Sequence, residues 1–312
     1  MGKNGTKALE IGYQTPLPWK PDQPDLPNNR SVAEGRLKSL LRRFERDPDF
    51  ELHYQKAMGR YIEDGYARRI EPDCTAELQW FLPHSGVLKK SDATKKMIIV
   101  FDSAVEFQVK SLNKALLTGP ALQKKLPSVM LKFRQREAAI CADISAMFSR
   151  IRLKPEDARY HRFLWSEKGK SEISSFQIDR LTFGDASSPF IANMTLRRTA
   201  DDHGKGHQRA VVAIYENFYV DDYLDSTDTP GQAIDLGRHV KAILERGGFH
   251  LCKRLSSSAI VRDEFGDKTG SETNFTTDWE TKVLGVKWNA LSDTFSFSVN
   301  RLDDVTYTNV AC

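Results

Sequence analysis

The stretch Phe218-Tyr219-Val220-Asp221-Asp222-Tyr223-Leu224-Asp225 decides how the rest of the chain is interpreted. An apolar, aromatic strand runs into two adjacent acids and then continues apolar. Adjacent carboxylates repel each other, and apolar flanks make them costlier to keep charged. A divalent cation is the usual way to offset that repulsion. The alternative is a simple turn after a strand, with a capping acid and a solvated one.

A third acid, Asp143, ends a second apolar run, Ala138-Ala139-Ile140-Cys141-Ala142-Asp143-Ile144. This run also has the character of a buried strand, so the two strands could meet side by side. They would then offer hard oxygen ligands to Mg²⁺, which prefers carboxylates and substrate phosphates. Two such ions can activate an attacking hydroxyl and stabilise the leaving oxygen of a phosphoryl transfer.

Around these acids, helix-like and strand-like segments alternate without a glycine-rich phosphate loop, which favours an α+β fold. Prolines keep residues 1–30 extended, and Asn29 or Ser31 is placed to cap the first helix. Residues 256–280 are polar and predict a loop. From residue 138 onward the order resembles a ferredoxin-like split βαβ arrangement. The pattern predicts helices at about 31–46, 51–64, 186–201 and 231–246, and strands at 78–82, 97–101, 138–143, 210–215, 217–220, 282–288 and 294–298.

Composition sets further bounds on this 312-residue chain, which can hold one large domain or two smaller ones. No apolar run is long enough to span a membrane, and the N-terminus lacks a secretory signal. The four cysteines are scattered, so a zinc ribbon is disfavoured, Cys141 is expected as a buried free thiol, and an intracellular setting is expected. The intervening glycines place His203 and His207 in a loop instead of a metal site.

The net charge of +4 is too small to identify a polyanionic partner, but the cations are clustered. Clusters of this kind attract phosphate backbones, and they are also typical of solvated helix faces. Composition leaves both interpretations open. The clusters are Arg36, Lys38, Arg42, Arg43 and Arg46; Lys89, Lys90, Lys95 and Lys96; and Arg134 with Arg136.

Short motifs in a fixed order carry a family resemblance from about residue 13 to residue 298. They are Leu17-Pro18-Trp19-Lys20, Leu26-Pro27-Asn28-Asn29-Arg30, Gly65-Tyr66-Ala67, Leu82-Pro83-His84, Val100-Phe101-Asp102-Ser103-Ala104, Ser111-Leu112-Asn113, Gly119-Pro120, Asp143-Ile144-Ser145-Ala146-Met147-Phe148, Arg162-Phe163-Leu164-Trp165, Phe183-Gly184, Ser188-Pro189-Phe190, Tyr219-Val220-Asp221-Asp222, Gly248-Phe249-His250-Leu251-Cys252-Lys253 and Leu284-Gly285-Val286-Lys287-Trp288. Any single motif is weak, and the ordered set is strong. The chain resembles the reverse transcriptases of Bel/Pao-type LTR retrotransposons.

The resemblance implies the fingers and palm of a right-hand polymerase, with a ferredoxin-like palm and no thumb. The chain would be part of a larger pol polyprotein, acting in the cytoplasm within a virus-like particle. The implied division is 1–30 as an extended segment, 31–118 and 150–190 as fingers, 119–149 and 191–298 as palm with the primer grip, and 299–312 as a truncated tail.

The resemblance also implies roles for particular residues. Asp143, Asp221 and Asp222 would bind two Mg²⁺ ions, for which Mn²⁺ could substitute. Phe148 would exclude a ribonucleotide's 2′-OH, and it could be a core aromatic at the same time. The remaining dNTP-binding residues would be Phe183, Gly184, Lys95, Lys96 and Lys253, with Lys253 equally consistent with a surface lysine, and the primer grip would comprise Leu284, Gly285 and Trp288. The implied partners are dNTPs and an RNA or DNA template with its primer.

Three positions depart from the family pattern. Ile98 stands where an arginine usually contacts the triphosphate, Asp185 where an apolar residue usually follows Gly184, and Arg254 where a tryptophan is expected. Ile98 and the expected absence of a thumb keep a second hypothesis open, a catalytically inactive remnant that only binds nucleic acid, whereas the three acids favour an active polymerase. An RNA virus polymerase is disfavoured by Phe148 and by the Tyr-Val pair before the acids.

Overall fold

The computed structural model describes residues 5–71, 79–91, 94–167, 172–265, 280–283 and 286–296, with the backbone alone at 89–91, 94–96, 265 and 280–283. The chain separates into two compact units, each assembled from three segments. The first unit comprises residues 1–123, 145–215 and 240–250, and the second comprises 124–144, 216–239 and 251–312. Helix α8, Pro230–Arg246, contributes to both units.

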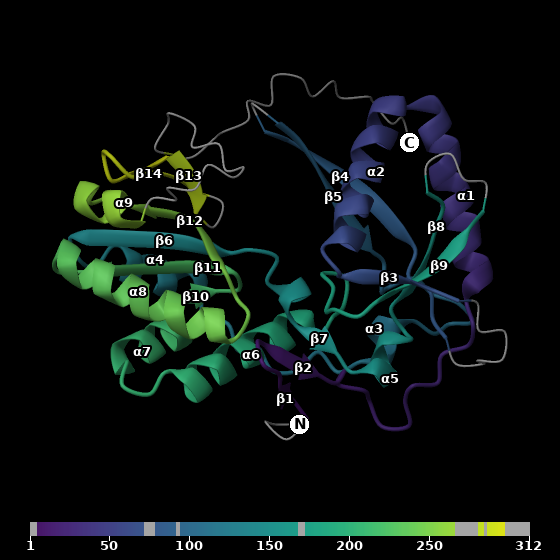
Figure 1. Ribbon diagram of the computed structural model, residues 1–312, viewed down its shortest axis with the longest axis horizontal. Helices are drawn as coiled ribbons and strands as arrows, with labels where there is room; N and C mark the ends of the chain where they lie inside the picture. The colour runs from purple at the N-terminus through teal and green to yellow at the C-terminus, as the bar shows by residue number, and fades with distance from the viewer. Residues whose placement is uncertain are drawn as a thin grey trace, which may run out of the picture. The chain divides into compact units, whose positions relative to one another are not determined.

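The first unit is built from short sheets and helices (Figure 1). Its sheets have the strand orders β1-β2-β7, β3-β9-β8 and β4-β5. Its elements are β1 (Lys7–Ala8), β2 (Tyr13–Thr15), α1 (Arg30–Arg46), α2 (Pro48–Glu63), β3 (Ala67–Ile70), β4 (His84–Ser91), β5 (Thr94–Phe101), α3 (Leu112–Ala115), the 3₁₀ turn η1 (Phe148–Arg150), β7 (Arg152–Leu153), α5 (Pro155–Ala158), β8 (Arg162–Trp165), β9 (Ser174–Ile178), α6 (Ser188–His203) and α7 (Gln208–Glu216).

Local sequence explains where α1 and α2 begin. Asp47 accepts a hydrogen bond from the Phe50 amide at 3.0 Å, and Pro48 occupies the first turn of α2, where its missing N–H costs nothing. Asn29 precedes α1, as expected, but its side chain makes no cap there. It donates instead to the Phe81 carbonyl at 2.8 Å and accepts from the Phe81 amide at 2.7 Å. Asn29 therefore fixes the segment before β4 in place.

The second unit is organised on one antiparallel sheet with the order β10-β11-β6-β12. Numbered along the chain, this is the 4-1-3-2 order of a ferredoxin-like sheet, so the predicted α+β fold class is confirmed. A hairpin sheet, β13-β14-β15, follows it. The remaining elements are α4 (Leu126–Phe133), β6 (Ala138–Ile144), β10 (Phe218–Tyr219), β11 (Asp222–Thr227), β12 (Leu251–Ser256), α9 (Ala259–Phe265), β13 (Glu280–Val283), β14 (Val286–Asn289) and β15 (Thr294–Ser296).

Both faces of this sheet are covered. On one face Cys141 and Leu224, which pair across β6 and β11, pack with Phe133 of α4 and with Trp288. Cys141 is buried as a free thiol, as predicted, and burial together with the charge of Asp222 raises its pKa to about 12. The other face borders a small cavity beside Gly237 of α8 and Val261 of α9. Packing on both faces explains why β6 reads as a continuous apolar run.

Three secondary-structure predictions were wrong. Within the predicted strand at 78–82, residues 79–82 form no strand and make only the isolated bridge between Phe81 and Arg162. Residues 210–215, predicted as a strand, lie in α7, where Ala210, Ala213 and Ile214 form a buried stripe. The predicted loop at 256–280 contains α9, although residues 266–279 lie outside the described part. The four predicted helices are confirmed, with shifts of a few residues at their ends. No helix in the described residues combines the length and apolarity needed to cross a bilayer.

Candidate active site

The paired acids lie at the turn of the β10–β11 hairpin. Tyr219 and Asp222 face each other across the two strands, so Val220 and Asp221 form a two-residue connection. Val220 has φ +57°, a conformation that is rare and strained for a β-branched residue. The Ile144 amide donates to the Asp221 carbonyl at 2.8 Å, which ties this turn to the end of β6.

The register of the sheet brings the third acid to the same place. Asp143 on β6 is the direct partner of Asp222 on β11. Residues directly opposite in an antiparallel pair share one face, with Cβ atoms about 5 Å apart. Burial, followed by the charges of Asp221 and Asp143, raises the pKa of Asp222 to about 7. The β10–β11 hairpin and β6 therefore concentrate negative charge on three partly buried side chains.

Lys253 approaches these acids from the opposite neighbour of β6. Cys252 pairs with Asp143 and Leu255 with Cys141, so Lys253 and Arg254 form a bulge opposite a single residue. Lys253 has φ +52°, and its ammonium forms an ion pair with the Asp143 carboxylate. Burial opposes the charge on Lys253, but the hydrogen bond and charge of Asp143 raise its pKa overall. The bulge thus directs a cation at the acids.

The donor set fits a divalent cation. Two carboxylates on adjacent strands, Asp143 and Asp222, and a third in the hairpin turn, Asp221, supply the hard oxygens that Mg²⁺ prefers. Burial and the two neighbouring carboxylates raise the pKa of Asp222, and a bound cation would favour its charged form. In the conformation described, no three His, Cys, Asp or Glu side chains among the described residues are gathered closely enough to hold a metal ion. The assignment of Asp143, Asp221 and Asp222 as metal ligands stays a prediction.

Phe148 and Phe183, both predicted to bind the dNTP, lie in the first unit. Phe148 is buried, and its ring meets that of Phe183 edge to face with centroids 4.5 Å apart. Phe183 is 63% exposed, so this pair presents one ring to solvent. Gly184 has no room for a side chain, since a Cβ there would lie 2.1 Å from the Phe101 carbonyl oxygen. The structure therefore brings Phe148 and Phe183 together and explains the glycine beside them.

A buried polar network supports the segment around Gly184, and no sequence motif predicts this network. Asp185 accepts a hydrogen bond from the Ser103 hydroxyl at 2.6 Å and lies 2.7 Å from Nε2 of His161. The His161 and Asp185 side chains are both fully buried. Asn113 adds a hydrogen bond to the Gly184 carbonyl at 3.1 Å. The departure from the family pattern at Asp185 was the one available signal, and its partners are distant in sequence.

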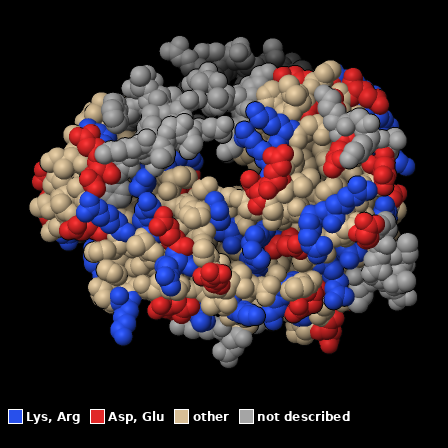
Figure 2. All heavy atoms as spheres, viewed as in Figure 1, with Lys and Arg blue, Asp and Glu red and all other residues tan. Residues whose placement is uncertain are grey.

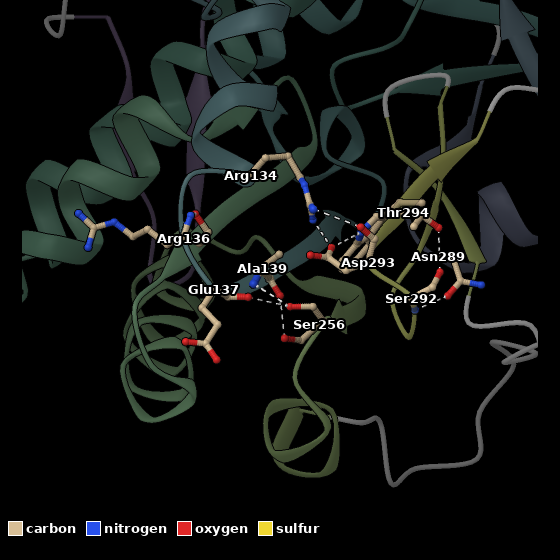
Figure 3. Close-up of polar contacts among 12 residues, drawn as sticks. Arg134, Arg136, Glu137, Ala139, Ser256, Asn289, Ser292, Asp293 and Thr294 are labelled. Carbon is tan, nitrogen blue, oxygen red and sulfur yellow. Dashed lines mark hydrogen bonds and ion pairs between the residues drawn. The ribbon is translucent and has the colours of Figure 1, made fainter.

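Trp288 is the one residue of the predicted primer grip that the structure describes. Its ring is buried 4.8 Å from that of Phe133, and its Nε1 donates to Asp293 at 2.9 Å. Arg134 also pairs with Asp293, which fastens the β14–β15 hairpin to the end of α4 (Figure 3). Leu284 and Gly285, and the side chains of Lys95 and Lys96, lie outside the described residues.

Two of the clustered cations are engaged within the fold. Arg134 pairs with Asp293 and Arg136 with Asp228. Ile98, which replaces the expected arginine, is half-buried on β5 opposite Val87. Neither observation supplies a replacement for the triphosphate contact that an arginine at position 98 was expected to make.

Comparisons with known proteins identify the family. The family described as reverse transcriptase (RNA-dependent DNA polymerase) matches residues 88–287. No curated protein matches the sequence. The structure is similar to the protease-reverse transcriptase of prototype foamy virus (a selenomethionine-labelled mutant), with a TM-score of 0.50 and 15% identity, covering 79% of this chain and 27% of that one.

The foamy viral protease-reverse transcriptase in complex with an RNA/DNA hybrid is also similar, with a TM-score of 0.52 and 16% identity. That match covers 92% of this chain and 30% of the viral one, so the chain spans less than a third of the viral protein's length. At such identities the likeness shows the fold alone. Because the family match covers more than half of the sequence, the chain belongs to the reverse transcriptase (RNA-dependent DNA polymerase) family.

Proposed function

We propose that the chain is the polymerase region of a retrotransposon reverse transcriptase, extending a primer 3′-OH with dNTPs on an RNA or DNA template. The observation that carries this proposal is the register that sets Asp143 opposite Asp222, beside Asp221 at the hairpin turn. The similar foamy viral enzyme in complex with an RNA/DNA hybrid supports a nucleic-acid partner. The ordered motifs support a Bel/Pao-type element, with this chain as part of a pol polyprotein in a cytoplasmic virus-like particle.

Each part of the site has a task in this reaction. Bound Mg²⁺, or Mn²⁺ in its place, would lower the pKa of the primer hydroxyl and stabilise charge on the leaving pyrophosphate. Asp143, Asp221 and Asp222 would hold the ions. The Lys253 ammonium, aimed at the same carboxylates, is suited to neutralise negative charge on the departing phosphates. Phe148 and Phe183 would pack against the nucleotide sugar, Gly184 would admit the nucleotide's close approach, and Trp288 would anchor the primer-grip hairpin.

A second candidate function is nucleic-acid binding without polymerisation, in a remnant of such an enzyme. Ile98 favours it, because an apolar, half-buried side chain cannot contact a triphosphate as an arginine does. Primer extension decides between the two candidates. The assay is incorporation of dTTP on a poly(A) template with an oligo(dT) primer, with Mg²⁺ or Mn²⁺.

The decisive variant is Asp221→Asn, which keeps the shape of the side chain but removes its charge. We expect it to lower primer extension by at least about a hundredfold while the thermal unfolding temperature stays equal or rises, because like-charge repulsion is relieved. The control is Asp235→Asn, which removes an exposed acid from α8 in the same unit and should leave extension unchanged. Equal extension by Asp221→Asn and the parent would refute the role of the paired acids. Nucleic-acid binding by a parent that extends nothing would favour the remnant.

A further inference from the structure

Two arginines of the first unit face each other across a β-bridge. Arg152, at the start of β7, pairs in antiparallel fashion with Arg180. The Leu181 amide donates to the Ile151 carbonyl at 3.0 Å and the Leu153 amide to the Asp179 carbonyl at 3.1 Å, so the pairing is fixed on both sides. Directly opposite residues of an antiparallel pair project from the same face. Two guanidinium groups therefore leave the backbone side by side.

A third arginine adds to this charge. Arg150 ends η1, two residues before Arg152, and its Nε donates to the Ser145 carbonyl at 3.2 Å. Burial, then the charge of Arg152, and more weakly that of Arg150, lower the pKa of Arg180 from its ordinary value. Arg150, Arg152 and Arg180, here called the arginine cluster, therefore repel one another.

Little in the fold offsets this repulsion. Asp179 is the nearby acid, but its carboxylate already accepts from Arg68 at 2.8 Å and from Gln177 at 2.7 Å. Among the described residues, no carboxylate forms an ion pair with Arg152 or Arg180. The Nε of Arg180 is buried and has no hydrogen-bond partner in the described part of the chain.

The surroundings of Arg150 are no better neutralised. It lies near His250, whose pKa is lowered by burial and then by Arg150. Lys241 adds positive charge at His250, and the acid there, Glu245, lies 3.7 Å from the Lys241 ammonium. Like charges facing each other across strands destabilise a sheet. An external anion would remove that cost.

The cluster lies on the two segments that carry Phe148 and Phe183. Arg150 closes the turn that Phe148 opens, and Phe183 follows Arg180 by three residues. The Phe148 and Phe183 rings are in contact, so the two segments converge.

We propose that Arg150, Arg152 and Arg180 form a phosphate-binding site for the nucleic-acid substrate, beside the Phe148–Phe183 pair. Guanidinium groups bind phosphate oxygens in a bidentate, charge-assisted way, and a partly desolvated cluster binds them more strongly than a solvated one. The phosphates belong either to the backbone of the template–primer or to the incoming triphosphate. This inference rests on the proposed function for the identity of its ligand.

The test compares Arg152→Gln and Arg180→Gln with Arg209→Gln, which removes an exposed arginine from α7 in the same unit. Three quantities are measured for each protein. They are the unfolding temperature of the free protein, the Kd for a labelled template–primer between about 50 and 200 mM KCl, and the KM for dNTP.

We expect both cluster variants to unfold at a higher temperature than the parent, since repulsion is relieved. If the cluster binds backbone phosphates of the template–primer, the Kd rises roughly threefold to tenfold in the cluster variants. The slope of log Kd against log salt then falls by about 0.7–0.9 for each phosphate that is no longer neutralised. If the cluster binds the triphosphate of the incoming nucleotide, the KM for dNTP rises instead and the Kd for the template–primer is unchanged. The control changes none of the three quantities. Arg152→Lys keeps the positive charge but lacks the planar guanidinium group that can form two parallel hydrogen bonds. It should therefore restore the salt slope and only part of the affinity.

Two results would overturn the proposal. One is an unchanged Kd, salt slope and KM in both cluster variants. The other is a lowered unfolding temperature with weaker binding and an unchanged salt slope, which marks a structural role. The binding readout needs no polymerase activity. A parent that binds through the cluster but extends no primer therefore contradicts the proposed function alone, and one that extends primers with an unchanged slope and KM contradicts this inference alone.

Discussion

Phe148 packs in the core, and the proposed function gives the same side chain a second role in sugar selectivity. Its ring is buried, yet it touches an exposed ring, Phe183, which limits the volume available beside it. A wall of this kind selects by exclusion, because an added hydroxyl on the sugar would collide with the ring. Shortening Phe148 should therefore admit ribonucleotides without creating any new attraction for them.

We expect Phe148→Val to raise the ratio of ribonucleotide to deoxyribonucleotide incorporation by about tenfold or more, since removal of the ring lifts a steric penalty of about 1–3 kcal/mol. The ratio of kcat/KM for each rNTP and its dNTP measures this. The variant also loses buried surface, so Phe176→Val serves as control. Phe176 is another buried ring of the same unit, stacked on Phe163, and its loss should destabilise the protein without changing sugar selectivity. An unchanged ratio in Phe148→Val would leave Phe148 a core aromatic only.

At the residue scale, the sequence predicts those parts of the site whose signal is local. Asp221 and Asp222 are adjacent, and Asp143 ends a recognisable buried strand, so their convergence could be inferred from the strand pattern. The pairing of Asp185 with His161 could not be inferred, because a buried polar contact leaves no periodic trace in the sequence. The juxtaposition of Arg152 and Arg180 could not be inferred either, because an isolated bridge joins segments that are distant in sequence.

At the scale of elements, β4 begins with a histidine that joins it to α2 and β8. His84 lies among the rings of Tyr54, Phe101, Phe163 and Trp165. A carbonyl only accepts, so Nε2 donates to the Leu164 carbonyl at 2.9 Å and Nδ1 accepts from the Tyr54 hydroxyl at 2.5 Å. Burial lowers the pKa of His84 to about 4, and the ring is therefore neutral at physiological pH.

This histidine should make the fold sensitive to acid. Its folded pKa, about 4, lies below the ordinary value of 6.5, so the unfolded chain binds the proton more tightly. The stability that depends on neutral His84 is fully present above about pH 6.5 and is lost progressively as the pH falls towards 4. The loss amounts to about 3 kcal/mol, from about 1.4 kcal/mol for each pKa unit. Urea unfolding at pH 7, 6, 5 and 4 measures it.

The matched variant is His84→Gln, whose side-chain amide can still donate to the Leu164 carbonyl but does not titrate. We expect it to flatten the dependence of the unfolding free energy on pH between about 6.5 and 4. His203→Gln, at the end of α6, is the control and should keep the slope of the parent. If His84→Gln and the parent lose stability equally over this range, another group causes the acid sensitivity.

The elements themselves were predictable where periodicity was long and clear. Helices such as α1 and α8 carry a helical stripe over four turns or more, and their boundaries were close. The run Ala210-Val211-Val212-Ala213-Ile214-Tyr215 is short, apolar and β-branched, so composition favoured a strand. In the structure, Ala210, Ala213 and Ile214 face inward at helical spacing, and tertiary packing overrides the β propensity.

At the scale of the whole molecule, net charge says little about how the protein meets nucleic acid. Acids and bases nearly balance, and both signs are interspersed on the visible face (Figure 2). The cations of α1 are unevenly placed, since Arg36, Lys38, Arg42, Arg43 and Arg46 are all exposed on one helix. Arg43 stacks on Phe50 at 3.6 Å, which leaves the others to face solvent. These cations either attract a phosphate backbone or only keep this face of the helix solvated.

Charge-matched variants separate those two roles. We expect the triple variant Arg36→Gln, Lys38→Gln and Arg42→Gln to weaken template–primer binding and to reduce the salt slope by up to about 2.7, at about 0.7–0.9 for each phosphate that is no longer neutralised. A control replaces three exposed lysines outside α1, Lys7, Lys56 and Lys205, with Gln and lowers the net charge by the same amount. Fluorescence anisotropy with one labelled duplex, measured across a salt series, gives both quantities. If the α1 cations contact phosphates directly, the slope changes in the α1 triple variant and stays at the parent's value in the control. Equal changes in both would assign binding to net charge and leave α1 as a solvated face, because long-range fields depend on total charge and contact ion pairs depend on position.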